Sequence, residues 1–187
     1  MKITTTPLND CLLLEPKIYK DDRGLFLESF NHKAFTQALG YEVNFVQDNL
    51  SVSVKGTLRG LHFQKGSDSQ AKLVQVLKGK VQDVVVDLRP GSSTYGNTFS
   101  IVLDDIERKQ LFIPKGFAHG FLALSDEVLF SYKCDGFYAP GSESGIIYND
   151  PDLNVEWQLP AEELVLSDKD RILKGFDALE SEQAFQW

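Results

Sequence analysis

The chain has 187 residues, of which 42% are hydrophobic and 25% charged, so it is long enough to form a globular domain with a sizeable core. We expect one domain over residues 1–187. The formal net charge of −8 argues against nucleic acid as a partner, because nucleic-acid binding needs a basic surface. An anionic small ligand would need cations gathered locally, against this overall field.

The cysteines and the N-terminal residues bear on the compartment. Cys11 and Cys134 lie far apart and form no CxxC pair, so neither a disulfide framework nor a structural zinc site is expected, and a reducing compartment fits. The short apolar run at residues 11–14 is too short for a signal peptide or a membrane span. We therefore expect a cytoplasmic protein without a membrane partner.

Short strands separated by turn residues dominate the pattern. A helix is predicted over residues 33–39, because Gly40 is a typical helix stop. Strands at residues 73–77 and 81–88 flank Lys78-Gly79-Lys80 and are predicted to form a hairpin. Further strands are predicted at residues 99–103, 110–113, 119–124 and 128–134, with a weaker one at 146–148. A second helix is predicted over residues 167–174, with Gly175 as its stop.

Many short strands at this spacing form sandwiches or barrels. The expected fold is therefore all-β: an antiparallel double-sheet jelly roll with a few short peripheral helices.

Residues two apart in a strand point to the same face. By this rule, four polar side chains share a strand face with apolar residues. A barrel of this kind often keeps a ligand cavity in its interior. The four groups are Lys72 with Val74 and Val76, His119 with Phe117, Phe121 and Ala123, Tyr132 with Val128, Phe130 and Cys134, and His62 with Leu58 and Gln64.

Each of the four polar residues also has a structural explanation. A lone histidine on an apolar face is usually a hydrogen-bonded core residue, and a lone tyrosine usually packs with its hydroxyl satisfied. A buried lysine needs a partner or a task, but Lys72 would also reach water from an open strand end. All four together favour a functional pocket over coincidence.

Two segments resemble the halves of the cupin signature. Pro114-Lys115-Gly116-Phe117-Ala118-His119 matches the P-x-G-x-x-H half. Gly60-Leu61-His62-Phe63-Gln64 lies where metal-binding cupins have H-x-H and then a glutamate, but Gln64 replaces the second histidine. Lys72 lies where an acidic ligand is expected, whereas zinc and transition metals prefer three or four histidine or carboxylate ligands. We therefore expect neither a metal nor another cofactor.

The same residues suit proton transfer. A histidine and a tyrosine in one cavity supply a base and an acid, and a lysine ammonium supplies a fixed charge for an oxyanion. Proton abstraction next to a carbonyl needs these parts, since an enolate must be stabilised.

Nearly the whole chain resembles the dTDP-4-dehydrorhamnose 3,5-epimerase family of cupin-type enzymes. The resemblance rests on the order and number of matching segments, from Asp22-Arg23-Gly24 to Leu166-Ser167-Asp168-Lys169-Asp170. The chain has Phe137 where the family commonly has tyrosine, and Tyr148 where it commonly has tryptophan. These departures leave the protein's preference for nucleotide or sugar less defined. Between the ends lie Gln47-Asp48-Asn49, Gly56-Thr57-Leu58-Arg59-Gly60-Leu61-His62, Gln70-Ala71-Lys72-Leu73-Val74, Val86-Asp87-Leu88-Arg89, residues 113–121, Tyr132-Lys133 and Asn149-Asp150-Pro151.

The resemblance implies a role for individual residues. His62 would be the base that takes a proton from the sugar carbon, with Asp170 orienting its imidazole. Tyr132 would be the acid on the opposite face of the ring, and Lys72 would stabilise the enolate oxygen. Substrate contacts are implied at Arg23, Glu28, Gln47, Asn49, Arg59, His119, Glu143 and Lys169, and Tyr138 would stack on the thymine.

Several of these roles compete with simpler ones. Ser167-x-x-Asp170 resembles a capping box, so Asp170 would then only cap a helix. Arg23 also suits an ordinary turn, and Tyr138 a packed loop. Strict alternation places Arg59 on the face opposite His62, so its contact with the ligand requires an irregular strand, for which Gly60 is the natural place. The cations Arg23, Arg59, Lys72 and Lys169 would form a local basic site for a diphosphate.

The implied activity is isomerisation without cofactor: epimerisation at C3 and C5 of dTDP-4-keto-6-deoxy-D-glucose to dTDP-4-keto-L-rhamnose, in dTDP-L-rhamnose biosynthesis. A mono-epimerase or keto-isomerase of a related sugar, a non-catalytic cupin that binds a sugar nucleotide, and a metal-dependent cupin oxygenase are the alternatives. The family also implies a homodimer, in which Arg23 and Glu28 would serve the partner's site.

Overall fold

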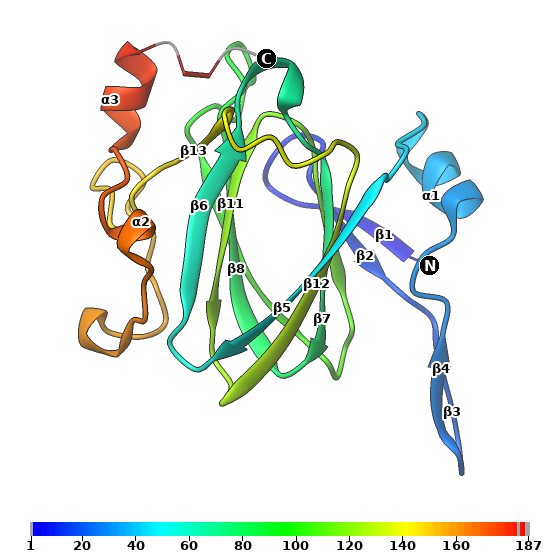
Figure 1. Ribbon diagram of the computed structural model, residues 1–187. Coiled ribbons are helices and arrows are strands. Elements are labelled where there is room, and N and C mark those ends of the chain that lie inside the picture. Colours follow the sequence, from blue (N-terminus) through cyan, green and yellow to red (C-terminus); the bar gives the residue numbers. More distant parts are fainter. Residues whose placement is uncertain (1, 183, 186–187) are drawn as a thin grey trace.

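The computed structural model describes residues 2–182 and 184–185, and its strands form two facing sheets (Figure 1). In spatial order the six-stranded sheet contains β1 (Lys2–Thr5), β2 (Leu12–Glu15), β10 (Gln110–Ile113), β7 (Lys72–Lys78), β12 (Glu127–Cys134) and β5 (Gln47–Val54). The five-stranded sheet contains β13 (Glu143–Gly145), β6 (Leu58–Gln64), β11 (Phe117–Ala123), β8 (Lys80–Asp87) and β9 (Thr98–Asp104). All pairings between these strands are antiparallel, so the predicted double-sheet jelly roll is confirmed.

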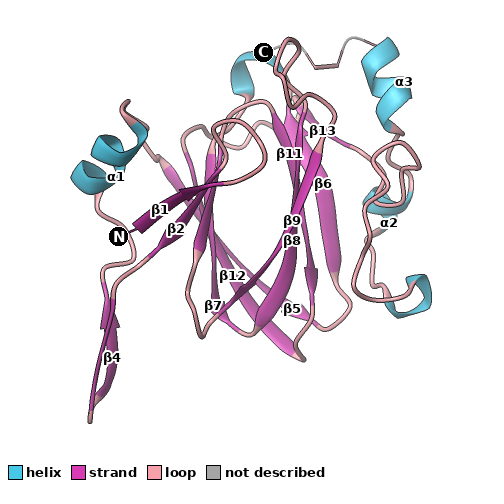
Figure 2. Ribbon diagram, turned by 180° about the vertical axis from the view of Figure 1, so that it is seen from behind, coloured by secondary structure: helices cyan, strands magenta, loops and turns pink. Residues whose placement is uncertain are grey.

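The remaining elements lie outside the two sheets (Figure 2). β3 (Ile18–Asp21) and β4 (Gly24–Leu27) form a hairpin that extends away from the barrel. The helices are α1 (His32–Leu39), α2 (Asp168–Arg171) and α3 (Phe176–Ser181), with 3-10 turns at Gly66–Asp68 and Ala161–Glu163. Among the described residues, no helix has the length and apolar character needed to cross a membrane.

Strand alternation places one core between the sheets and two further clusters outside them. Val74 and Val76 of β7 meet Phe121 of β11 and Phe130 of β12 in the central core, as their shared faces predict. A second cluster lies between the outer face of the five-stranded sheet and the C-terminal segment around α3. In a third, Phe35 of α1 covers the outer face of the six-stranded sheet. β8 is therefore buried on both faces.

The first predicted helix is confirmed. Asn31 caps α1 by accepting from the Ala34 N–H at 3.0 Å, and Gly40 ends it with φ +78°. The strands predicted at residues 99–103, 110–113, 119–124 and 128–134 agree with β9, β10, β11 and β12 to within two residues.

The predicted hairpin of residues 73–88 is wrong, because the chain turns a corner at Gly79. β7 pairs with β10 and β12, whereas β8 pairs with β9 and β11 in the other sheet. Gly79 has φ +84°, and a Cβ there would lie 2.5 Å from the carbonyl oxygen of Glu127. This tight single-residue corner sends consecutive strands into opposite sheets.

Two C-terminal predictions also fail. The helix predicted over residues 167–174 ends at Arg171, and Gly175 begins α3 instead of ending α2. Asp150 Oδ2 accepts from the Phe176 N–H at 2.8 Å, so a residue distant in sequence holds the chain where α3 begins. The weak strand at residues 146–148 is displaced: β13 ends at Gly145, and Ile146 makes an isolated bridge with residue 174.

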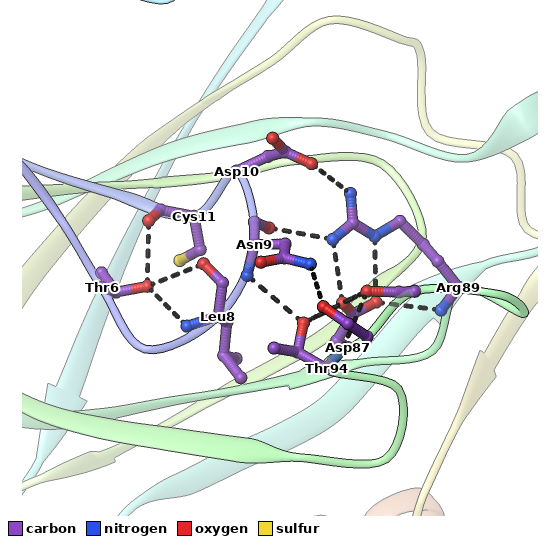
Figure 3. Close-up of polar contacts among 10 residues, drawn as sticks. Thr6, Leu8, Asn9, Asp10, Cys11, Asp87, Arg89 and Thr94 are labelled. Carbon is purple, nitrogen blue, oxygen red and sulfur yellow. Dashed lines mark hydrogen bonds and ion pairs between the residues drawn. The ribbon is translucent and has the colours of Figure 1, made fainter.

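A polar network fastens the N-terminal loop to the end of β8 (Figure 3). The Asp87 side chain is fully buried and accepts from the guanidinium of Arg89 at 2.8 and 2.9 Å and from the hydroxyls of Ser92 and Thr94. Arg89 also donates to Asp10 at 2.8 Å. Burial opposes ionisation of Asp87, but these hydrogen bonds outweigh it and lower the pKa of its carboxyl.

Candidate active site

Two cavities inside the barrel share His62, Lys72 and Tyr132 as lining residues. The first, here called the Tyr138 cavity, has a volume of about 350 Å³, and the second, the Arg59 cavity, about 280 Å³. The Tyr138 cavity is further lined by Gln47, Asn49, Phe63, Gln64, Gln70, Cys134, Tyr138 and Glu143. The Arg59 cavity is further lined by Ser51, Arg59, His119, Gly120, Phe121, Phe130, Ser167, Lys169 and Asp170.

The shared residues come from opposite sheets. His62 on β6 and His119 on β11 are direct cross-strand partners in the five-stranded sheet. Lys72 on β7 and Tyr132 on β12 belong to the six-stranded sheet. Where sheets pack face to face, side chains fill the space of about 10 Å between them, but here the two cavities take the place of part of that core. A candidate base and a candidate acid therefore lie on the two sides of one cavity.

An irregularity in β6 brings Arg59 onto the same face as His62. His119 pairs with His62 and Phe121 pairs with Arg59, so two residues of β6, at 60 and 61, lie opposite the single residue Gly120 of β11. The shift is centred on Gly60, which has φ +119° and where a Cβ would lie 2.5 Å from the Gly120 Cα. The irregularity that the sequence required at Gly60 is confirmed, and it reverses the alternation on its N-terminal side.

Leu58 is affected by the same reversal. It pairs with Leu122, a neighbour of the inward-facing Phe121, and so lies on the opposite face from His62. The predicted shared face of Leu58 and His62 is wrong for this reason.

His62 and Asp170 form a close pair. His62 Nε2 lies 2.5 Å from Asp170 Oδ1, and the Asp170 side chain is only 5% exposed. Asp170 Oδ2 accepts from the Ser167 hydroxyl, whose oxygen in turn accepts from the Asp170 N–H and caps α2. Burial opposes ionisation of Asp170, but the contacts with His62, Ser167 and Lys169 outweigh it and lower its pKa. Asp170 thus contacts His62 and takes part in the cap at once.

A second histidine–carboxylate pair lies deeper, and the sequence reasoning missed its acid. His119 Nε2 is 2.9 Å from Asp83 Oδ2, and the Asp83 side chain is fully buried. Asp83 Oδ1 has no hydrogen-bond partner in the described structure. The signal was present, since Asp83 shares a strand face with Val81 and Val85 and the same alternation rule would have found it.

Lys72 and Tyr132 have shifted pKa values. Burial lowers the pKa of Lys72, while the acidic groups of Cys134, Asp83 and Glu143 oppose this effect. Burial also raises the pKa of Tyr132, so its phenol stays protonated at neutral pH. A protonated phenol is the form that an acid requires.

Residues predicted to bind substrate contact one another along the Tyr138 cavity. Tyr138 donates from its hydroxyl to Glu143 Oε2 at 2.7 Å and from its N–H to Gln47 Oε1 at 3.0 Å. Glu143 Oε2 also lies 2.5 Å from Lys169 Nζ. Gln47 donates to Asn49 Oδ1 at 3.0 Å. Through these side-chain and backbone contacts the five residues form one connected group, here called the rim.

Arg23 and Glu28 do not reach either cavity. Arg23 lies at the tip of the β3–β4 hairpin and pairs with Asp21, and its side chain is 89% exposed. Glu28 follows the hairpin and accepts from Asn31. Of the predicted site residues, the single chain brings all but these two together.

Among the described residues, no three His, Cys, Asp or Glu side chains gather in a way that would hold a metal ion. Gln64, at the position of the second cupin histidine, uses its amide in hydrogen bonds to a loop.

The family model described as dTDP-4-dehydrorhamnose 3,5-epimerase matches residues 5–178. The chain belongs to this family. The dTDP-4-dehydrorhamnose 3,5-epimerase of Methanothermobacter thermautotrophicus is 51% identical over 167 residues, 89% of each chain. A crystal structure of the dTDP-6-deoxy-D-glucose-3,5-epimerase of Legionella pneumophila with dTDP-4-keto-L-rhamnose is 45% identical, with a TM-score of 0.94 over 100% of this chain and 98% of that one. The family also has a relative named dTDP-4-dehydrorhamnose 3-epimerase from Streptomyces niveus, 41% identical over 86% of this chain and 77% of the relative.

Proposed function

We propose that this epimerase inverts C3 and C5 of dTDP-4-keto-6-deoxy-D-glucose and so makes dTDP-4-keto-L-rhamnose. The observation that carries the proposal is the placement of His62 and Tyr132 on opposite sheets across one cavity. Inversion requires a proton to leave one face of the sugar ring and another to arrive at the opposite face. A base and an acid on facing sheets meet this requirement without a cofactor.

His62 is the proposed base. Asp170 accepts the hydrogen bond from Nε2, so the favoured tautomer carries its proton there and leaves the Nδ1 lone pair free. Nδ1 takes a proton from a carbon next to the ketone, and the electron pair of that C–H bond moves into the enolate. Asp170 then stabilises the imidazolium that forms.

Lys72 and Tyr132 complete the reaction. The ammonium of Lys72 donates to the enolate oxygen, and its lowered pKa makes it a stronger hydrogen-bond donor. Tyr132 returns a proton to carbon from the other face, which reverses the centre. His119, held by Asp83, contacts the sugar from the same side as His62.

The rim residues and cations hold the nucleotide. Tyr138 stacks on the thymine, while Gln47, Asn49 and Glu143 bond to polar groups of the ligand. Arg59 and Lys169 supply local positive charge for the diphosphate on a protein whose formal net charge is −8.

We further propose a cytoplasmic homodimer in which Arg23 and Glu28 complete the partner's site. Edge strand β5 turns polar side chains inward and leaves Leu50, Val52 and Val54 each about 60% exposed on its outer face. The projecting hairpin exposes further apolar residues beside Arg23. A second copy of this chain would cover both surfaces and would bring Arg23 to a cavity that its own chain does not let it reach.

Turnover in heavy water tests the proposal. We expect deuterium at both C3 and C5 of the product, and we expect His62→Ala to lower the rate by about 10²- to 10⁴-fold while dTDP still binds. Label at only one carbon would instead support a 3-epimerase, the second candidate that the Streptomyces niveus relative favours. Ligand binding without exchange of any sugar proton, or full activity of His62→Ala, would refute the proposed chemistry.

A further inference from the structure

Gln64 occupies the second metal-ligand position of the cupin signature, yet its side chain is committed to a loop. It is 6% exposed, and Nε2 donates to the carbonyl oxygens of Asp68 at 2.7 Å and Phe137 at 3.2 Å. Oε1 accepts from the Ala139 N–H at 2.7 Å. The amide therefore contacts the residues immediately before and after Tyr138.

The loop backbone is held at three consecutive residues as a result. Gln64 binds Phe137 and Ala139, and the N–H of Tyr138 itself donates to Gln47 Oε1 at 3.0 Å. The Tyr138 side chain remains 54% exposed at the mouth of the cavity, with its hydroxyl bonded to Glu143. A fixed backbone beneath an exposed ring is preorganised for stacking, because less conformational freedom is lost when a ligand binds.

We propose that Gln64 is a positioning residue for the nucleotide, which it serves by holding the loop that presents Tyr138 to the thymine. The inference rests on the proposed function, in which Tyr138 stacks on the base. It gives a structural task to the side chain that stands where a metal-binding cupin has its second histidine. Strand pairing holds His62, Lys72 and Tyr132 in place, and none of the three hydrogen bonds of the Gln64 side chain reaches them.

The test is a double-mutant cycle with dTDP as the probe. We expect Gln64→Ala to weaken dTDP binding and to raise KM by roughly tenfold, with kcat changed by less than about threefold, because the missing hydrogen bonds act on binding and not on proton transfer. In a Tyr138→Ala background, Gln64→Ala should then have little further effect on dTDP affinity, since both changes remove the same interaction.

Gln82 offers a matched control. It is 1% exposed, donates to the Glu156 carbonyl oxygen at 2.8 Å and accepts from the Gln158 N–H at 2.8 Å, so it holds a loop in the same manner, but it lines neither cavity. We expect Gln82→Ala to lower the melting temperature while dTDP affinity stays within about twofold. A general loss of stability is thereby separated from a loss of nucleotide positioning.

Three results would overturn the inference: unchanged dTDP affinity and KM in Gln64→Ala, an equal cost of Gln64→Ala with and without Tyr138, or an equal loss of affinity in Gln82→Ala. If the alanine variant fails to fold, Gln64→Met keeps the side-chain length and removes the same hydrogen bonds. Wild-type protein that does not bind dTDP would instead refute the proposed function. If the wild type binds dTDP and the Gln64 variants bind it with the same affinity, only the role of Gln64 would be refuted.

Discussion

Asp170 contacts both His62 and the start of α2, and one substitution separates the two roles. In Asp170→Asn, the amide oxygen can still accept from the Ser167 hydroxyl, while the amide nitrogen takes the place of Oδ1 beside His62 Nε2. Because an amide N–H donates and does not accept, the imidazole would have to carry its proton on Nδ1. Nδ1 is the atom that we propose as the base, so the variant keeps the packing but disables proton abstraction.

The magnitude follows from the contact. The pair is 2.5 Å apart and Asp170 is 5% exposed, so the lost charge-assisted hydrogen bond alone contributes about 1.5–3 kcal/mol. A misplaced base costs about 10²- to 10⁴-fold in rate, and we expect Asp170→Asn to lower kcat within that range while KM changes little. The cap is the smaller effect: Ser167→Ala should lower the free energy of unfolding by about 1 kcal/mol and leave kcat within about fivefold.

The assay measures kcat, from deuterium incorporation into the sugar, and thermal unfolding for both variants side by side. Full kcat in Asp170→Asn, with only a lower melting temperature, would show that Asp170 acts as a cap alone. Equal losses of kcat in Ser167→Ala and Asp170→Asn would likewise refute the orienting role.

Three further predictions concern the partner, the buried network and the irregular strand. Arg23→Ala and His62→Ala are each expected to be inactive on their own. When the two variants are mixed, about a quarter of wild-type activity should return, because half of the dimers then contain one complete site out of two. No recovery would place Arg23 in its own chain's site. The pKa of Asp87 in the folded protein lies below its usual 3.8, so its contribution to stability is complete above about pH 4 and is lost as the pH falls through the folded value. In urea unfolding at pH 7, Asp87→Asn should therefore lower the free energy of unfolding by about 3 kcal/mol. On acidification, the variant should lose less of its free energy of unfolding than the wild type. Gly60→Ala should destabilise the fold by more than about 2 kcal/mol, whereas Gly24→Ala, with a similar φ of +125° but open space around it, should cost less. Equal costs would mean that backbone strain, and not the close approach to the neighbouring strand β11, makes Gly60 necessary.

Local pattern was a sufficient guide wherever a strand is regular. Alternation placed Lys72, His119 and Tyr132 on inward faces, and each of them lines one or both cavities in the structure. It failed where a contact distant in sequence controls the backbone. The close approach of Gly60 to Gly120 reversed the face of Leu58, and no local signal on β6 gives the size of that shift.

The corner at Gly79 and the end of α2 are failures of the same kind. A Lys-Gly-Lys turn is compatible with a hairpin, and only the pairing of β8 with β9 and β11 decides that the strands part. Past the end of α2, the start of α3 is held by Asp150, which lies 26 residues before Phe176 in the sequence. Glycine marks a place where the chain changes direction, but its new direction depends on partners that the local sequence does not contain.

The irregular strand also brings the proposed base, His62, and the proposed phosphate-binding cation, Arg59, onto one face of β6. A regular β6 would present His62 inward and turn Arg59 to the outer face, which the apolar cluster under α3 occupies. The extra residue at Gly60 brings both side chains into the barrel on one strand, opposite Tyr132 of the other sheet. The inward placement of Arg59 beside His62, and with it the proposed binding of the diphosphate, therefore depends on Gly60 and Gly120, which allow two backbones to meet without side chains between them.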